Sequence, residues 1–165
     1  MSGSRLISRL EVDEAIAPVN TTGAGQDGDW VKFTGQRMLI VVQAGAWAGG
    51  AAALTLQQAS DNAGTGAKAL AFTRRWTKTA TATPGVAAAK LAEVAVAANT
   101  FDVDTARQVH VIEVDADKMD VNGGFSHLRV RTATPGANAD LISALYLQGD
   151  LRYAGDPDTH ADPKE

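Results

Sequence analysis

The chain has 165 residues, of which 45% are hydrophobic but only 5% aromatic, and its formal net charge is −4. This length suits one domain with its own core, and the acidic balance argues against a general nucleic-acid binder, which would carry a basic stripe. The chain has no cysteine, so disulfides, thiolate metal sites and cysteine nucleophiles are excluded.

The N-terminal part of the chain is expected to lie outside the main domain. Residues 5–12 (RLISRLEV) partly alternate between polar and apolar positions, which indicates a strand or an extended arm. Residues 20–29 (NTTGAGQDGD) are too polar and glycine-rich to hold a helix or to bury much area. The opening MSGSR is not followed by the apolar stretch of a signal peptide. We therefore predict an N-terminal arm and linker over residues 1–28.

A series of short strands follows. Residues 30–33 (WVKF) form a short strand, and residues 37–43 (RMLIVVQ), the most apolar run, predict a central buried strand. Residues 44–52 (AGAWAGGAA) are too rich in glycine and alanine for regular structure, which predicts a loop with Trp47 at or near its tip. Residues 53–59 alternate again, so this apolar stretch is read as strand, loop and strand, and not as a membrane span.

The middle of the chain contains one segment whose structure stays open. Residues 60–66 (SDNAGTG) predict a turn, and residues 68–77 (KALAFTRRWT) predict another strand. A break follows at residues 81–85 (TATPG). Residues 86–98 (VAAAKLAEVAVAA) are good helix formers, but their hydrophobic period is mixed. Both a short helix and a strand or irregular segment are therefore kept for them.

The pattern after residue 99 is that of strands again. Residues 101–103 are followed by residues 108–115 (QVHVIEVD), where Val109 and Val111 are expected to share one face and His110 to face solvent. In this alternation the two valines would point into the core.

The remaining strands carry clear turn signals between them. The run NGG at residues 122–124 predicts a tight turn with a positive φ angle. Residues 126–132 (SHLRVRT) alternate, with a leucine and a valine facing inward and three residues facing solvent, namely His127, Arg129 and Arg131. Residues 140–151 form the last strand, and the polar tail over residues 154–165 has no apolar anchor.

About eight strands separated by turns predict an all-β fold. Such a chain forms a β-sandwich or a jelly-roll-like domain. We place this domain at residues 29–153, between the N-terminal arm (1–28) and the polar C-terminal tail (154–165).

No motif of a catalytic or cofactor-binding site is found. Residues 61–68 (DNAGTGAK) superficially resemble a phosphate-binding loop, but a single residue separates the glycines and no Ser or Thr follows the lysine. A turn between two strands is the better interpretation. The sequence also lacks the Gly-x-Ser-x-Gly signature of a serine nucleophile.

Potential metal ligands are present but not at the spacings that metal sites need. Asp115, Asp117 and Asp120 lack the regular acidic spacing and the closing glutamate of an EF-hand, so we expect them to cap a turn. The histidines form no His-x-His or His-x-x-x-His pair: they are His110, His127 and His160. We therefore predict a protein that is not an enzyme and has no metal or cofactor.

Three segments resemble a family of small virion proteins from tailed phages. Residues 54–70 (LTLQQASD through GTGAKAL) are similar to a strand, turn and strand of that family, and residues 111–130 (VIEVD, then MDVNGGFSHLRV) resemble its second shared block. Residues 144–147 (ALYL) with 151–153 (LRY) resemble its closing strand. The arm before Trp30 and the loop around Trp47 have no clear counterpart in this pattern.

The resemblance implies a structural part of the virion, with a capsid decoration or cement protein as the first expectation. Proteins of that kind carry β-sandwich or jelly-roll domains that sit on the outer capsid lattice, and the family has no catalytic residues to transfer. The implied partners are the major capsid protein and further copies of this chain, as a dimer or trimer, without nucleic acid or membrane. The protein would be made in the bacterial cytoplasm and end on the capsid surface.

Contacts of such a protein are expected where aromatic and arginine side chains are available near exposed segments, because these residue types dominate interface energies. We predict contacts from the arm, from the Trp47 loop and from the end of the last strand, namely Arg5, Leu6, Ile7, Arg9, Leu10, Trp47, Arg152 and Tyr153. Two alternatives stay open: a tail, neck or head-fibre component, and a module that binds glycans on the host surface.

Overall fold

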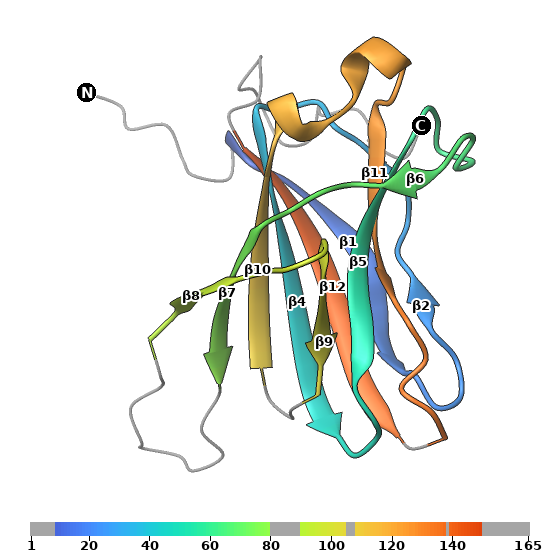
Figure 1. Cartoon of the computed structure of the whole chain (residues 1–165), viewed down its shortest axis with the longest axis vertical. Helices are drawn as coiled ribbons and strands as arrows, with labels where there is room; N and C mark the ends of the chain where they lie inside the picture. Colours follow the sequence, from blue (N-terminus) through green and yellow to red (C-terminus); the bar gives the residue numbers. More distant parts are fainter. Residues whose placement is uncertain (1–8, 80–89, 105–107, 138, 150–165) are drawn as a thin grey trace.

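The structure is a computed structural model that describes residues 9–79, 90–104, 108–137 and 139–149 (Figure 1). It confirms an all-β, sandwich-like domain. The strands are β1 (Glu11–Asn20), β2 (Gln26–Asp27), β3 (Val31–Lys32), β4 (Arg37–Trp47), β5 (Ala52–Ala59), β6 (Lys68–Ala69), β7 (Arg74–Thr79), β8 (Ala92–Ala95), β9 (Thr100–Val103), β10 (Gln108–Asp115), β11 (His127–Thr132) and β12 (Asp140–Gly149). Two short 3₁₀ helices, η2 (Ala116–Lys118) and η3 (Val121–Gly123), connect β10 to β11.

The strands form two antiparallel sheets that pack against each other (Figure 1). Sheet A has the order β1-β12-β4-β10-β7-β8. Sheet B has the order β2-β11-β5-β6, with β3 also paired to β11 and β9 also paired to β5. A single hydrophobic core lies between the sheets.

The pairing of the main strands is nested. With β2 and β3 counted together as one strand, eight main strands follow one another as β1, β2–β3, β4, β5, β9, β10, β11 and β12. The first pairs with the last, the second with the seventh, the third with the sixth and the fourth with the fifth. A long hairpin folded over into two sheets gives this arrangement, which is that of a jelly roll. The segment from β6 to β8 is inserted between the fourth and fifth main strands, and it widens sheet A by β7 and β8.

The core consists of the inward positions of both sheets, chiefly Met38, Ile40, Val42, Ile112, Val114, Ile142, Ala144 and Tyr146 from sheet A and Leu54, Leu56, Leu128 and Val130 from sheet B. These positions alternate along their strands, as a strand with one face on a core requires. The alternation predicted for residues 126–132 is confirmed for Leu128 and Val130.

The predicted N-terminal arm is wrong for residues 11–27. Residues 11–20 form β1, which pairs with β12 from Glu11 opposite Gln148 to Asn20 opposite Leu141. Ala15 and Ile16 on this strand are buried, and that burial outweighs the cost of ordering the segment. Of the predicted arm, residues 1–8 lie outside the described residues, as does the predicted tail over residues 154–165.

The polar passage after β1 is also part of the domain. Gln26 and Asp27 pair with β11, and the amide of Gly28 donates to the carbonyl of Val130 at 2.8 Å. A Cβ atom at Gly28 would lie 2.9 Å from that same oxygen and 3.0 Å from the Tyr146 hydroxyl. Glycine is therefore needed here because only a residue without a side chain allows the two backbones to approach this closely.

Trp47 does not lie at a loop tip. It is the last residue of β4 and is partly buried against the core, and its indole Nε1 donates to the carbonyl of Gly50 at 3.2 Å. The strand extends further than the glycine and alanine content suggested because it pairs with β12 as far as Asp140. The Asp140 carboxylate then accepts from the amides of Ala48 and Gly49 and so ends the strand in a tight turn.

Two histidines expected to face solvent are buried. His110 is 0% exposed and His127 is 6% exposed. On β10 the buried positions are His110, Ile112 and Val114, so Val109 and Val111 face outward, opposite to the predicted phase. The imidazole of His110 packs against Phe101 in a tilted arrangement, with 5.0 Å between ring centroids, and its Nδ1 lies 2.8 Å from a guanidinium nitrogen of Arg75.

Of the two alternatives for residues 86–98, the structure shows a strand in the second half of the segment. Residues 92–95 form β8, which pairs with β7. Residues 80–89 lie outside the described residues.

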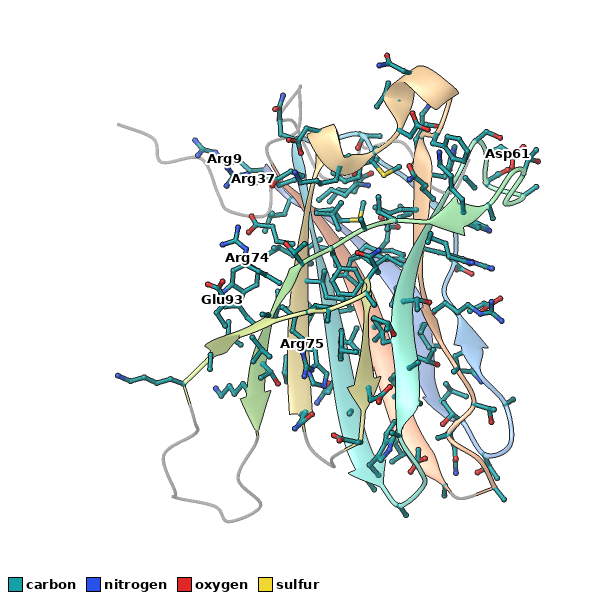
Figure 2. All side chains as sticks on the ribbon, in the orientation of Figure 1. Arg9, Arg37, Asp61, Arg74, Arg75 and Glu93 are labelled. Carbon is teal, nitrogen blue, oxygen red and sulfur yellow. The ribbon has the colours of Figure 1, made fainter. Side chains whose placement is uncertain are left out.

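Two predicted turns are confirmed. In the turn at residues 60–66, the Asp61 carboxylate at the tip (Figure 2) accepts from the amides of Ala63 and Thr65. The NGG turn is confirmed too: Gly124, with φ +83°, ends η3 in the left-handed region that favours glycine.

Candidate functional site

The outward side of sheet A is lined by apolar side chains. On β4, β10 and β12 the residues that alternate with the core positions are themselves leucine or valine over several positions. One residue each from β1 and β7 extends this surface to both sides. We call this surface the apolar face; its members are Val12, Leu39, Val41, Trp76, Val109, Val111, Leu145 and Leu147.

The strand register brings these side chains into rows across the sheet. In the central row, Leu145, Val41, Val111 and Trp76 stand directly opposite one another on β12, β4, β10 and β7. A second row runs from β1 through Leu147 to β4, with Val12 and Leu39 at its ends. Directly opposed side chains are about 5 Å apart and touch. The apolar face is therefore one continuous surface and not a set of scattered residues.

Apolar side chains with this exposure are unusual on a sheet face that is in contact with solvent. Val12 is 49% exposed and Leu145 is 43% exposed, and the other members of the apolar face are half-buried by their neighbours. Eight residues, each covering about 4.8 Å across the strands and about 6.8 Å along them, give an area on the order of 250 Å². A contiguous apolar patch of this size approaches the largest that monomeric proteins expose, and such patches are often binding sites.

The outward side of sheet B has the opposite character. Arg129 on β11 donates to Gln57 on β5 at 2.9 Å and forms an ion pair with Asp27 at 3.1 Å. Arg131 pairs with the same carboxylate at 2.9 Å, and the guanidinium of Arg129 lies 4.6 Å from the ring centre of Trp30. Polar residues that satisfy one another are what a solvated sheet face shows. The two sides of the sandwich are thus adapted to different surroundings.

Ion pairs border the apolar face on two sides. Arg37 on β4 lies 3.3 Å from Asp115 and 3.8 Å from Glu113, both on β10. Arg74 on β7 lies 3.5 Å from Glu93 on β8, and Figure 2 shows these two side chains close together beside their strands. A polar rim around an apolar centre is the usual composition of a protein interface.

Two further charges stand at opposite edges of the apolar face. Glu14 on β1 is directly opposite Leu145, and Lys78 on β7 is directly opposite Val109. Neither forms an ion pair with another residue in the described part of the chain. Since β12, β4 and β10 separate the two strands, they are about 19 Å apart.

Shallow hollows lie along the outward side of sheet A. One, of about 300 Å³, is lined by residues that include Arg9, Leu10, Leu39 and Leu147. A second, of about 250 Å³, lies beside Trp76 and Arg74. Arg9 and Leu10, both predicted contact residues, therefore stand at the rim of the apolar face, and Figure 2 shows Arg9 near Arg37.

The other predicted contact residues do not join this surface. Trp47 packs on the core, and the rest lie outside the described residues: Arg5, Leu6, Ile7, Arg152 and Tyr153. Sequence reasoning missed the outward residues of β4 and β12. The available signal was the unbroken apolar run, as in MLIVV of β4, because a strand that is apolar in both phases is a strand whose two faces are both covered.

The carboxylates that could suggest a metal site each have another role. Asp120 accepts from the amide of Gly123 at 2.9 Å and pairs with Lys68, and these contacts, the lysine foremost, lower the pKa of that carboxyl. Asp115 pairs with Arg37, and Asp117 with Lys118 at 3.7 Å. No group of three or more histidine and acidic residues that could hold a metal occurs in the described ranges.

In comparisons with known proteins, no family model, curated protein or solved structure matches this chain. The described residues also include no helix that is long and apolar enough to cross a membrane. The apolar face with its charged rim is therefore the feature from which a function can be inferred.

Proposed function

We propose that this protein is a non-enzymatic structural subunit of a tailed-phage particle that binds protein subunits at the capsid surface, either the major capsid protein or further copies of this chain, through the apolar face of sheet A. The observation that carries the proposal is the continuous row of Leu145, Val41, Val111 and Trp76, which faces solvent on a sheet whose opposite side already covers the core. The proposal places the protein on the outer capsid lattice as a decoration or cement protein.

The physical case is for protein binding. Removing apolar surface from water contributes about 25 cal/mol per Å² in gross terms, so burial of an apolar area on the order of 250 Å² would favour binding. Trp76 supplies an aromatic anchor near the edge of the face, and the ion pairs around Arg37 and Arg74 provide a polar rim. Repetition of one modest contact over a lattice gives high avidity.

The choice of a phage particle rests on the resemblance of residues 54–70, 111–130 and 144–153 to small virion proteins. A jelly roll is compatible with that role, since viral capsid proteins have this fold, but lectins and cupins have it too. The fold by itself does not select a function.

A lysine at position 145 is expected to weaken binding to the particle at least tenfold. Leu145→Lys places a charge in the central row, where docking would bury it without a partner. Binding can be measured by co-sedimentation of the purified protein with phage particles prepared without it. Val121→Lys is the matched control because Val121, on η3 and 68% exposed, lies away from sheet A. Equal binding of wild type and Leu145→Lys would show that the face is not the docking site.

Removal of residues 1–8 tests the predicted arm. A deletion of residues 1–28 would remove β1 and part of the core, so it cannot separate binding from folding. The shorter deletion is expected to leave the urea unfolding midpoint unchanged and to weaken particle binding, because Arg9 and Leu10, which follow the deleted residues, line the hollow beside Leu147. Full binding by the shortened protein would leave the arm without a role.

The two alternative functions would give different experimental results. A tail, neck or head-fibre component would appear as density away from the capsid lattice in a reconstruction of the particle. A glycan-binding module would use Trp76 and the hollow beside it, and would give a glycan-array signal that Trp76→Ala abolishes. Val111 is the only apolar residue directly opposite Trp76, and Glu93 stands on its other side. The apolar row that continues from Val111 through Val41 to Leu145 nevertheless favours a protein partner, because a sugar would contact only the ring and its charged neighbours.

A further inference from the structure

We infer that the partner of the apolar face is a second copy of this chain, packed face to face about a two-fold axis parallel to the strands. The inference rests on the proposed function in one respect, namely that this face binds protein, and it adds the identity of the partner. Self-association of this kind requires a surface that is complementary to itself.

The order of strands in sheet A meets this requirement. β4 lies at the centre of the apolar face, with β12 and β1 on one side and β10 and β7 on the other. A two-fold axis parallel to β4 lays β12 of one copy over β10 of the other, and β1 over β7. This rotation leaves the height along the strands unchanged, so Leu145 packs on Val111 of the partner and Leu147 lies over its Glu113, while Leu39 and Val41 meet their own copies. Sheets packed in this aligned way are the common arrangement of β-sandwiches.

The charges at the two edges fit the same arrangement. Because β1 lies over β7 of the partner, Glu14 of one copy comes next to Lys78 of the other, and the symmetry forms this contact twice. Glu14 lies in the central row, opposite Leu145, and Lys78 is one row further along, opposite Val109. That offset of about 7 Å along the strand is within reach of the two long side chains. The docking therefore gives partners to two charges that have no ion pair within the described part of one chain.

The other way to stack two sheets by a two-fold axis is disfavoured. An axis perpendicular to the strands would lay β1 over β1 and β7 over β7. Glu14 would then face Glu14, and Lys78 would face Arg74 of the partner. Like charges brought together in an interface oppose association. The parallel axis also places Arg37 over its own copy, but each Arg37 is ion-paired with Asp115 of its own chain, so the parallel axis is the one that the charge pattern supports.

The area indicates a weak dimer. With on the order of 250 Å² from the apolar face of each copy, and about as much again from the polar positions around it, the interface buries on the order of 1,000 Å² in total, which is at the lower limit for specific interfaces. We expect association in the micromolar range, which concentration on a lattice would strengthen.

Charge reversal at the two edges tests the inference. Sedimentation velocity on the full-length protein over a range of concentrations should show a monomer–dimer equilibrium. Glu14→Lys and Lys78→Glu are each expected to weaken dimerisation about tenfold, since each replaces two attractive contacts by two repulsive ones. The double variant should restore the dimer. An equimolar mixture of the two single variants should form heterodimers, because both contacts are then attractive again.

Rescue of this kind is specific for a contact between copies. Within one chain the two positions are separated by three strands, so the double variant cannot compensate inside the monomer. Leu145→Lys should be monomeric in the same experiment, which provides a second variant if a charge reversal fails to fold. A wild-type protein that stays monomeric, or dimers that neither reversal weakens, would overturn the inference.

The outcome is separable from that of the proposed function. A monomer whose particle binding is still lost in Leu145→Lys would mean that the face docks directly on the capsid, and the inference would fail while the proposed function stands. A dimer that obeys the charge swap but binds no particle would support the inference and contradict the proposed function.

Discussion

Replacement of Tyr146 by alanine is expected to lower the free energy of unfolding by about 4 kcal/mol. Tyr146 on β12 is fully buried, and its hydroxyl reaches from sheet A to sheet B. There it accepts from the amide of Val130 at 2.9 Å and donates to the carbonyl of Asp29 at 3.1 Å. Burial raises the pKa of this phenol above its usual value, so the group keeps the proton that it donates.

The contribution of the hydroxyl can be separated from that of the ring. Tyr146→Phe keeps the ring but leaves a buried amide and a carbonyl without this partner, which costs about 2 kcal/mol. Urea unfolding followed by tryptophan fluorescence measures both variants. Leu145→Ala, the neighbouring residue that points to the other side of the sheet, is the matched control and should cost less than about 1 kcal/mol. A loss below about 0.5 kcal/mol for Tyr146→Phe would argue that water replaces the hydroxyl.

Stability is expected to fall as the pH decreases from about 6.5 to about 4 because of His110. Burial, and then the nearby charge of Arg75, lower the pKa of His110 from 6.5 to about 4, against the opposing influence of Asp104. The unfolded chain therefore binds a proton over this window that the folded chain does not, so acid favours unfolding. Since one pKa unit corresponds to about 1.4 kcal/mol, the loss from His110 is up to about 3 kcal/mol.

Urea unfolding at several pH values between 4 and 7 checks this expectation. His110→Gln removes the titrating group, so the decline of stability with falling pH should become shallower even if the variant is less stable overall. Part of the decline should persist in that variant, because burial also lowers the pKa of His127. The double variant with His127→Gln should be nearly independent of pH in this window. An unchanged decline in His110→Gln would contradict the buried, neutral state of this histidine.

Local sequence patterns were sufficient for much of the secondary structure. The alternation in residues 126–132 and the glycines in residues 60–66 act over a few residues, so they predict a strand and a turn without knowledge of the rest of the chain. The same patterns did not predict β1, because its register depends on β12 at the other end of the sequence.

The candidate site was harder to predict for a related reason. On β4 both phases are apolar, so the sequence does not say whether Met38 and Ile40 or Leu39 and Val41 face the core. On β10 the histidine lies in the inward phase and the valines in the outward phase, opposite to what polarity suggests. The packing of sheet B decides both cases, because it covers one side of sheet A and leaves the other open.

The sequence by itself thus determined that the protein is an all-β domain without cysteine chemistry or a recognisable catalytic motif, since composition, alternation and motif spacing are properties of neighbouring residues. Only the tertiary structure decided that the main strands form a jelly roll and that residues 11–27 belong to it. It alone also places Leu145, Val41, Val111 and Trp76 in one outward-facing row, because these residues are up to about 100 positions apart in the chain and meet only through the register of β4, β7, β10 and β12.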